Sequence, residues 1–544
     1  MRIRGAGLVV SLGFLLLVAA YAPGISAQTG PAAGVSEACG LPRELLVRTA
    51  RGYFPGRSGQ LQTLPAPPDF VGPGLPHIGP WDYLQQVPLF WYGPEHIKAQ
   101  RSIGNAATSA DIAPTEAELL DFDRFKADGR PLDEALVPGR REPPRLVVTI
   151  VWDAGGMNVL DEWPKSWPYL RSLIPKGTWY ERATIGTTPS TTAPVHATIG
   201  TGDYPRSHGI TSHRMRLGNR LVAPWETASS LLVSPTLADL YDRSVDNAAK
   251  IGTVATREIH LGMMGHGSRW GGGDKDLAVL RAARNSITLG AEGTAWNLTG
   301  RVSKEFKFPS YANKGGRFLA DVNRTDRADG KADGRWRDHP MANLLNGFES
   351  PARVPFQTRL VERIIRKEGF GEDAVPDMMF INYKLIDFVS HAWSMNSLEM
   401  KDAVRAQDED LKRFVSFLDK NVGEGKWVIV LTADHGSVPA PETTGATVIS
   451  PLKLAGTINR EFSEGGTTLV KHIQGTQMIL DEVRLRQLGL PVEAVAGFVR
   501  TLTNGDLYSG TPPSFAEART PAFEATFDSS VLDRAPCLRR DGNP

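Results

Sequence analysis

Three short segments of the sequence carry side chains that can bind a metal ion. Asp153 follows the apolar run RLVVTIVW, and a carboxylate at the end of a buried strand is costly unless it is paired or binds metal. Asp387 and His391 are four residues apart, so on a helix they face one side and can share an ion. Asp434 and His435 follow the apolar run KWVIVLT and suit a cation such as Zn²⁺. Each segment taken alone also has an ordinary structural explanation, such as a turn cap for Asp153. Together the segments predict a metal centre.

A fourth segment supplies a hydroxyl group at the start of a predicted helix. In TTPSTTAPVHATIGTGDYPRSHGI, Thr192 is followed by Ala193 and Pro194, and a hydroxyl with a proline in the first turn is typical of a helix N-terminus. The free backbone N–H groups at such an end form an anion site that is suited to phosphate. An ordinary capped helix is the alternative.

The elements that must position these residues alternate between strands and helices. Continuous apolar runs are typical of strands buried on both faces of a parallel sheet, and four occur in RLVVTIVWDAGG (145–156), KIGTVAT (250–256), DMMFINYKLID (377–387) and KWVIVLTADHG (426–436). A shorter strand is predicted at 87–93, and helices are predicted at 109–122 and 398–420. This order predicts an α/β fold, with a doubly wound, mostly parallel sheet sandwiched by helices and with inserted cap lobes. Ligands of such sheets bind at the carboxyl ends of the strands, where the Asp residues lie.

The order Asp, Thr, Asp-x-x-x-His, Asp-His resembles the alkaline phosphatase superfamily. Within it, PSTTAPVHATIGTGDYPRSHGI resembles the nucleophile segment of the type I phosphodiesterase/nucleotide pyrophosphatase branch. The resemblance covers residues 145–215 and 375–440, and it implies an alkaline phosphatase-like fold with two divalent metal ions, most readily Zn²⁺, in one site. One ion would be bound by Asp153, Thr192, Asp434 and His435, and the other by Asp387, His391 and one further histidine.

The position of that last histidine departs from the family pattern, which places it well downstream of the Asp-His pair. After His435 the sequence offers only His472, in LVKHIQGTQM. His77 fits better, because PHIGPWDYLQQVPLFWYGP resembles the final histidine loop and strand of the family, although it stands near the start of this chain. We therefore expect a circular permutation in which His77 is the last metal ligand, with His472 as the alternative.

The resemblance also implies a function and a mechanism. Thr192 would attack phosphorus to form a phospho-threonine, while the N–H of Ala193 and the helix N-terminus hold the developing charge. His213 stands where the phosphodiesterase-like branch has an Asn, so it could donate a hydrogen bond to a phosphoryl oxygen or be a surface histidine. We expect His196 to be structural. The expected activity is that of a phosphodiesterase or nucleotide pyrophosphatase, and a phosphomonoesterase is the alternative.

Two further functions have less support from the sequence. A sulfatase of this superfamily would need a Cys or Ser in a formylglycine motif, and neither cysteine lies in one. A non-catalytic binding protein would not need every type of metal ligand that this chain carries.

Composition and the N-terminus indicate an exported protein that acts on small molecules. The chain has 544 residues, with 61 basic and 60 acidic side chains, and this balance gives no reason to expect a nucleic-acid partner. Arg2 and Arg4 precede the apolar run GLVVSLGFLLLVAAYA, and ISA ending at Ala27 is a cleavage site, so a secreted or periplasmic protein is expected. An uncleaved anchor is the alternative. Export would allow Cys39 and Cys537 to pair, and two free thiols are the other possibility.

The substrate would be a small phosphate ester, and the oligomeric state stays open. The expected organisation is a signal peptide (1–27), an N-terminal arm with little regular structure (28–75), the permuted end of the catalytic fold (76–140), a core with the nucleophile (141–264), an inserted loop-rich lobe over the site (265–350), a core with the metal motifs (351–440), and a cap with a C-terminal tail (441–544).

Overall fold

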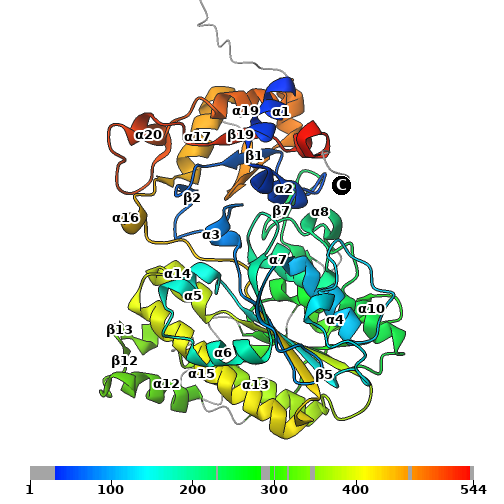
Figure 1. Ribbon diagram of the computed structural model, residues 1–544. Coiled ribbons are helices and arrows are strands. Elements are labelled where there is room, and N and C mark those ends of the chain that lie inside the picture. The colour runs from blue at the N-terminus through cyan, green and yellow to red at the C-terminus, as the bar shows by residue number, and fades with distance from the viewer. Residues whose placement is uncertain are drawn as a thin grey trace, which may run out of the picture.

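The computed structural model describes residues 31–538, except for 228–230, 283–294, 299, 315–317, 344–348 and 464–467. The expected signal peptide lies outside this range. Among the described residues, no helix combines the length and the apolar character that crossing a bilayer requires. Figure 1 shows a large lower lobe that contains the main sheet and a smaller upper lobe that contains both ends of the described chain.

The main sheet has nine strands in the order β11-β10-β9-β14-β5-β15-β3-β6-β4. The five strands β10, β9, β14, β5 and β15 run parallel to one another. The next strand, β3, runs antiparallel to both of its neighbours, β15 and β6. All five predicted strands are present, so the predicted α/β fold with a mostly parallel sheet is confirmed. The strands are β3 (Leu89–Tyr92), β4 (Arg101–Thr108), β5 (Leu146–Trp152), β6 (Thr178–Thr184), β9 (Ile251–Ala255), β10 (Leu277–Arg281), β11 (Trp296–Asn297), β14 (Asp377–Tyr383) and β15 (Trp427–Thr432).

Helices cover both faces of this sheet, because alternate side chains of its buried strands point to opposite sides. On β5, Val148 and Ile150 belong to the core beneath α13 and α15, while Val147 and Val151 belong to the core beneath α4, α7 and α10. The helices of the lower lobe are α3 (Asp82–Gln85), α4 (Ile112–Leu119), α5 (Met157–Glu162), α6 (Pro168–Leu173), α7 (Thr192–Thr201), α8 (Pro205–His208), α9 (Pro224–Thr227), α10 (Leu237–Ser244), α11 (Val302–Glu305), α12 (Phe318–Asp326), α13 (Arg353–Glu368), α14 (Leu385–Trp393) and α15 (Leu398–Leu418).

One buried acid lies in the core between α4 and the sheet. Glu116 is 1% exposed, and the hydroxyl of Thr149 on β5 donates a hydrogen bond to its carboxyl group. Burial raises the pKa of Glu116 to about 8, and this hydrogen bond only partly opposes the rise. Glu116 is therefore protonated at neutral pH.

The upper lobe consists of residues 31–75 and 441–538, and it corrects the expectation of an N-terminal arm with little regular structure. A four-stranded sheet has the order β17-β18-β1-β19, so β1 lies between two strands from the far end of the chain. Cys39 and Cys537 form a disulfide, with their Cα atoms 5.8 Å apart. The elements are α1 (Pro31–Gly40), α2 (Arg43–Arg51), β1 (Leu61–Leu64), β2 (Phe70–Val71), α16 (Pro441–Thr444), β16 (Val448–Ile449), α17 (Pro451–Phe462), β17 (Val470–Gln474), β18 (Gln477–Leu480), α18 (Glu482–Leu488), α19 (Val492–Val499), α20 (Asn504–Leu507) and β19 (Ala525–Asp528).

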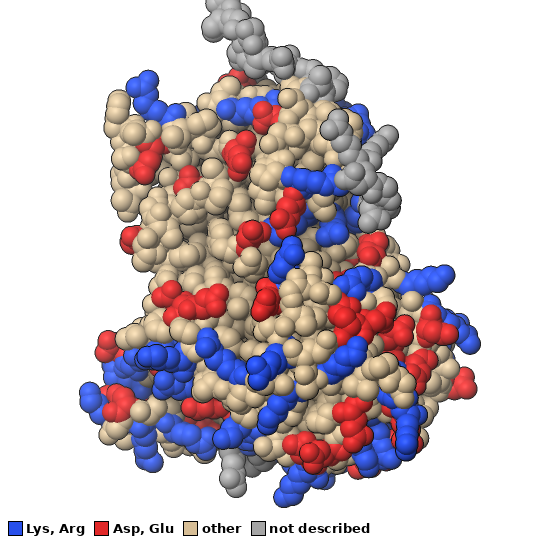
Figure 2. All heavy atoms as spheres, viewed as in Figure 1, with Lys and Arg blue, Asp and Glu red and all other residues tan. Residues whose placement is uncertain are grey.

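The segment at 265–350 also differs from the expectation of a separate lobe over the site. β10 and β11 extend the main sheet beside β9, and Asp321 on α12 forms an ion pair with Arg359 on α13, so much of this segment belongs to the lower lobe. Two small hairpin-like sheets, β7 (Met215–Leu217) with β8 (Arg220–Val222) and β12 (Arg335–Trp336) with β13 (His339–Pro340), complete the strands. On the face shown in Figure 2, basic and acidic side chains are interspersed over the lower lobe, and much of the upper lobe is uncharged.

Candidate metal centre

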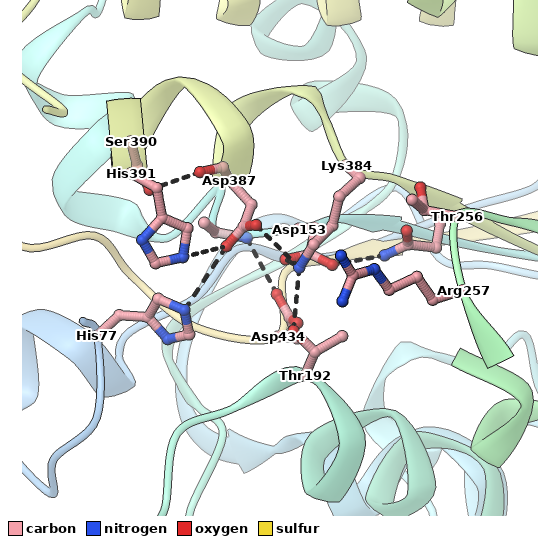
Figure 3. Close-up of polar contacts among 12 residues, drawn as sticks. His77, Asp153, Thr192, Thr256, Arg257, Lys384, Asp387, Ser390, His391 and Asp434 are labelled. Atoms are coloured by element: carbon pink, nitrogen blue, oxygen red, sulfur yellow. Dashed lines mark hydrogen bonds and ion pairs between the residues drawn. The ribbon is translucent and has the colours of Figure 1, made fainter. Parts of the chain in front are cut away.

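The three neighbouring strands β14, β5 and β15 place four polar residues at one edge of the main sheet. Asp153 follows β5, Lys384 follows β14, and Asp434 and His435 follow β15. Because these strands are parallel, their carboxyl ends meet, and all four side chains are buried between the two lobes. Figure 3 shows Asp153, Lys384 and Asp434 converging on one point.

A first group of possible ligands is centred on Asp387. Asp387 and His391 both lie on α14, as their spacing predicted, and His391 Nε2 is 3.4 Å from Asp387 Oδ1. The same oxygen is 3.6 Å from Nε2 of His77, which arrives from the loop after β2 (Figure 3). His472 lies on β17 of the upper sheet and is absent from the groups of ligand atoms found among the described residues.

A second group of possible ligands consists of Asp153, which follows β5, and of Asp434 and His435, which follow β15. His435 Nε2 is 3.4 Å from Asp434 Oδ2 and 3.6 Å from Asp153 Oδ1. The ring of His435 also stacks on that of His77, with 3.4 Å between the ring centroids, so the two groups are adjacent.

Three imidazoles are held in the form that a metal ion requires. Each Nδ1 lies within 2.7–2.9 Å of a backbone carbonyl oxygen, that of Ser190 for His77, Gly74 for His391 and Gly436 for His435. A carbonyl can only accept, so each Nδ1 carries a proton and each Nε2 is the ring atom left to face the centre. Burial lowers the pKa of His435 to about 4, so this ring is neutral.

The donor set fits divalent metal ions. Asp387 Oδ1, Asp434 Oδ2 and His435 Nε2 are buried and have no hydrogen-bond partner, which is costly unless something else satisfies them. Zn²⁺ binds such atoms at about 2.0–2.2 Å in tetrahedral sites, which places neighbouring ligand atoms about 3.3–3.5 Å apart. The separations of 3.4–3.6 Å in both groups agree with that spacing.

Lys384 is a residue of the site that the sequence analysis missed. Its Nζ is 2.7 Å from Asp153 Oδ1, 3.0 Å from Asp387 Oδ2 and 3.0 Å from Thr192 Oγ1, so all three of its N–H groups have acceptors in the centre. Burial alone would lower the pKa of Lys384, but the attraction of Asp153 and Asp387 outweighs it and raises that pKa. Lys384 is therefore a fixed positive charge.

Lys384 also explains how three buried carboxylates can lie so close together. Burial would raise the pKa of Asp387, but Lys384 and His391 hold it well below its ordinary value. Lys384 likewise lowers the pKa of Asp153, against the effect of burial. Burial and repulsion by Asp153 raise the pKa of Asp434 well above its ordinary value, so this carboxylate has the greatest need of a cation.

Asn382 and His196 connect the carboxylates to the helix that bears Thr192. Asn382 Nδ2 donates to Asp153 Oδ2 at 2.8 Å and lies 3.1 Å from Nε2 of His196. Nδ1 of His196 donates to the carbonyl oxygen of Thr192 at 2.8 Å, which agrees with the structural role expected for this histidine. His260, also missed from the sequence, approaches Asp153 Oδ2 to 3.4 Å.

Thr192 is the first residue of α7, and Thr191, rather than Thr192, is its N-cap. The hydroxyl of Thr192 faces Lys384 (Figure 3). The N–H of Ala193 donates to Nε2 of His213 at 3.3 Å, so this N–H group is already occupied and that nitrogen accepts. Burial lowers the pKa of His213 to about 3, which keeps the ring neutral. These two groups are thus bonded to each other, and their expected contact with a phosphoryl oxygen stays a prediction.

Several known proteins are similar to this chain in sequence, and one solved structure is similar to it in fold. A protein from Myroides odoratus named calcium-transporting ATPase is 23% identical over 56% of this chain and 62% of its own length. The alkaline phosphatase PafA of Elizabethkingia meningoseptica is 23% identical over 54% of this chain and 60% of its own. The matched part of this chain thus spans about 60% of these relatives. The crystal structure of wild-type PafA has a TM-score of 0.50, with 17% identity over 71% of this chain and 84% of that one, which shows a common fold.

The family model described as type I phosphodiesterase/nucleotide pyrophosphatase matches residues 147–487, which is more than half of the chain. This range includes Asp153, Thr192, Asp387 and Asp434 but begins after His77. The chain therefore belongs to the type I phosphodiesterase/nucleotide pyrophosphatase family of the alkaline phosphatase superfamily.

Proposed function

We propose that this protein is an exported hydrolase of phosphoric esters that uses Thr192 as its nucleophile and holds two divalent metal ions, most readily Zn²⁺. The observation that carries the proposal is the position of the Thr192 hydroxyl, 3.0 Å from Lys384 and beside carboxylate and imidazole atoms that lack partners. Asp153, Thr192, Asp434 and His435 would hold one ion, and Asp387, His391 and His77 the other.

In this proposal the side chains carry out an in-line displacement in two steps. Bound divalent ions would lower the pKa of coordinated hydroxyl groups and neutralise negative charge on phosphoryl oxygens. Thr192 Oγ1 attacks phosphorus and the alcohol of the ester leaves, which gives a phospho-threonine, and water then releases inorganic phosphate or the remaining monoester. Lys384 donates to Thr192 Oγ1 and supports the negative charge that develops there. The N-terminus of the buried helix α7 adds a favourable dipole.

The family description favours a phosphodiester or pyrophosphate substrate, but one observation favours a phosphomonoester as a second candidate. Three carboxylates, two divalent ions and the fixed charge of Lys384 leave a net charge of about +2 in the centre. That charge matches the dianion of a phosphomonoester better than the single charge of a diester. The two classes differ in the ratio of kcat/KM for p-nitrophenyl phosphate and bis-p-nitrophenyl phosphate.

We also propose the circular permutation expected from the sequence. It is supported by His77 lying beside Asp387 and by β3, which pairs with β15 in the main sheet although it precedes β5 in the chain. Export is supported by the disulfide between Cys39 and Cys537, since such bonds persist in oxidising compartments.

The central experiment replaces Thr192 and looks for the covalent intermediate. Thr192→Ala should lower kcat by about 10³-fold or more and abolish any phosphorylated peptide containing residue 192 after an acid quench. Thr191→Ala is the matched control, because Thr191 is the neighbouring buried hydroxyl and has no hydrogen-bond partner. Turnover of Thr192→Ala at the wild-type level, or activity that survives complete chelation of metal, would contradict the proposal.

A further inference from the structure

A second group of acidic side chains lies apart from the candidate metal centre. Asp242 is near the end of α10, and Asp274 and Asp276 lie in the loop that leads into β10. One oxygen atom from each carboxylate lies within 4.8 Å of the other two. In Figure 1, α10 is on the right of the lower lobe, while α14, which bears Asp387, is on its left. The group shares no residue with the catalytic site.

Two buried oxygen atoms, one in this group and one on the nearby Asn247, lack a hydrogen-bond partner. Asp242 is 5% exposed, and its Oδ1 is buried without a hydrogen bond. Asn247 Oδ1 is also buried and unpaired. The amide of Asn247 links the two segments, because its Nδ2 donates to the carbonyl of Gly272 at 3.0 Å and its N–H donates to the carbonyl of Asp242 at 2.9 Å. The unpaired oxygens therefore lie where the end of α10 meets the loop before β10.

The carboxylates are also not paired with a positive side chain. Among the residues that the structure describes, no Lys or Arg forms an ion pair with Asp242, Asp274 or Asp276. Burial and the charge of Asp274 raise the pKa of Asp242 to about 7, even though the N–H of Ala249 donates to its carboxylate. Burial and the neighbouring carboxylates likewise raise the pKa of Asp276, which is 9% exposed. Three mutually repelling carboxylates held in place without a cation are costly.

We propose that Asp242, Asp274 and Asp276 bind a Ca²⁺ ion, with Asn247 Oδ1 as a further ligand. All of these donors are oxygens, which is the ligand type of hard cations, and none is a histidine or a thiolate. Ca²⁺ takes six to eight oxygen ligands in flexible geometries, so carboxylates from a helix end and a loop, together with water, suit it better than the strict octahedron of Mg²⁺. The ion fastens α10 to the loop before β10.

The test uses the full-length protein with its catalytic centre loaded with Zn²⁺, in buffer freed of Ca²⁺. Calorimetric titration with CaCl2 should show one binding event, and about 5 mM Ca²⁺, above the millimolar dissociation constants of weak extracellular sites, should raise the Tm by several degrees. Asp274→Asn should weaken the binding about tenfold or more, because Ca²⁺ affinity depends on the number of charged ligands. Asp274 is exposed, so this variant should fold. Asp246→Asn, at an exposed acid in the turn after α10, is the matched control and should behave as wild type.

The Asp276→Asn substitution should change the stability of the protein in one direction without Ca²⁺ and in the other direction with Ca²⁺. Without Ca²⁺ this variant should be at least as stable as wild type, because one repelling charge has been removed. With Ca²⁺ it should be the less stable protein, because it has lost a ligand. The proposal is overturned if wild type shows no heat of Ca²⁺ binding, if wild type and Asp274→Asn respond equally, or if the same concentration of Mg²⁺ produces an equal shift in Tm.

Discussion

Replacing Lys384 with Met tests what the positive charge of Lys384 contributes to the candidate centre. Methionine keeps a similar length and volume but removes the ammonium group that contacts Asp153 Oδ1 at 2.7 Å, Asp387 Oδ2 at 3.0 Å and Thr192 Oγ1 at 3.0 Å. Two effects follow, one on the stability of the metal-free protein and one on the reaction, and they can be measured separately.

The stability effect arises because the variant leaves buried carboxylates without their counter-charge. Lys384 is 7% exposed, and Asp153 and Asp387 are at most 3% exposed. Removing one partner of a buried ion pair costs about 3–5 kcal/mol. The metal-free Lys384→Met protein should therefore unfold at lower denaturant concentration than wild type by this amount. Added Zn²⁺ should raise its Tm more than that of wild type, because the ion supplies the missing positive charge.

The effect on catalysis arises from the contact between Lys384 and Thr192, the proposed nucleophile. A hydrogen bond to a charged group contributes about 1.5–3 kcal/mol. If it strengthens as negative charge develops on Thr192 Oγ1, its loss lowers kcat by about 10- to 150-fold, with KM changed much less. The assay is steady-state hydrolysis of p-nitrophenyl phosphate and of its diester by the Zn²⁺-loaded protein.

Lys250→Met is the matched control for this experiment. Lys250 pairs with Asp373 at 2.6 Å and with Asp377 at 3.6 Å, away from the catalytic residues, so its loss should affect stability but not kcat. The reasoning is refuted if metal-loaded Lys384→Met keeps kcat within about threefold of wild type, which would give Lys384 a purely structural role.

Three further predictions concern the last ligand, a buried acid and the disulfide. His77→Ala should lower bound Zn²⁺ from two to one per chain and kcat by at least about 100-fold, whereas His472→Ala should change neither. The free energy of unfolding should fall between pH 4.5 and 8, since Glu116 ionises in the unfolded chain first, and Glu116→Gln should remove a decline of up to about 5 kcal/mol. Replacing Cys39 and Cys537 together with Ser should cost about 2–5 kcal/mol of stability without changing kcat.

Each of these predictions has a result that contradicts it. Equal metal content in the His77→Ala and wild-type proteins, measured by mass spectrometry, would remove His77 from the ligand set. Parallel stability curves for Glu116→Gln and wild type in urea across pH 5–8 would show that Glu116 is ionised in the folded protein. A large loss of kcat in the double serine variant at a temperature where it is folded would mean that the disulfide shapes the site.

The sequence predicted the residues that lie at the ends of buried strands better than those that reach the site by tertiary packing. Asp153 and Asp434 follow continuous apolar runs, and such runs identify buried parallel strands whose carboxyl ends must meet. Asp387 and His391 share a helix face because of their spacing alone. Lys384 gave no comparable signal, because a polar residue after a strand is ordinary until the neighbouring carboxylates are in place.

The upper lobe could not be predicted for a related reason. Residues 61–64 look like part of a Gly- and Pro-rich arm, and their strand exists only because β18 and β19, more than 400 residues later in the chain, pair with both of its edges. Local patterns contain no information about a partner at that distance. The mutual hydrogen bond of Ala193 and His213 was missed in the same way, since nothing in their spacing indicates that one satisfies the other.

The pairing of β1 between β18 and β19 also has a consequence for the order in which the candidate centre is assembled during synthesis. The loop that presents His77 leaves the upper lobe, where Ile78 packs directly against Gly475. A chain still growing on the ribosome would have made His77 early, yet residues 477–480 and 525–528, which complete the sheet beside it, emerge about 400 or more residues later. Contacts so distant in sequence form late in folding. We therefore expect the centre to gain the imidazole of His77 only after these later strands have been made, so shorter nascent chains would lack this ligand.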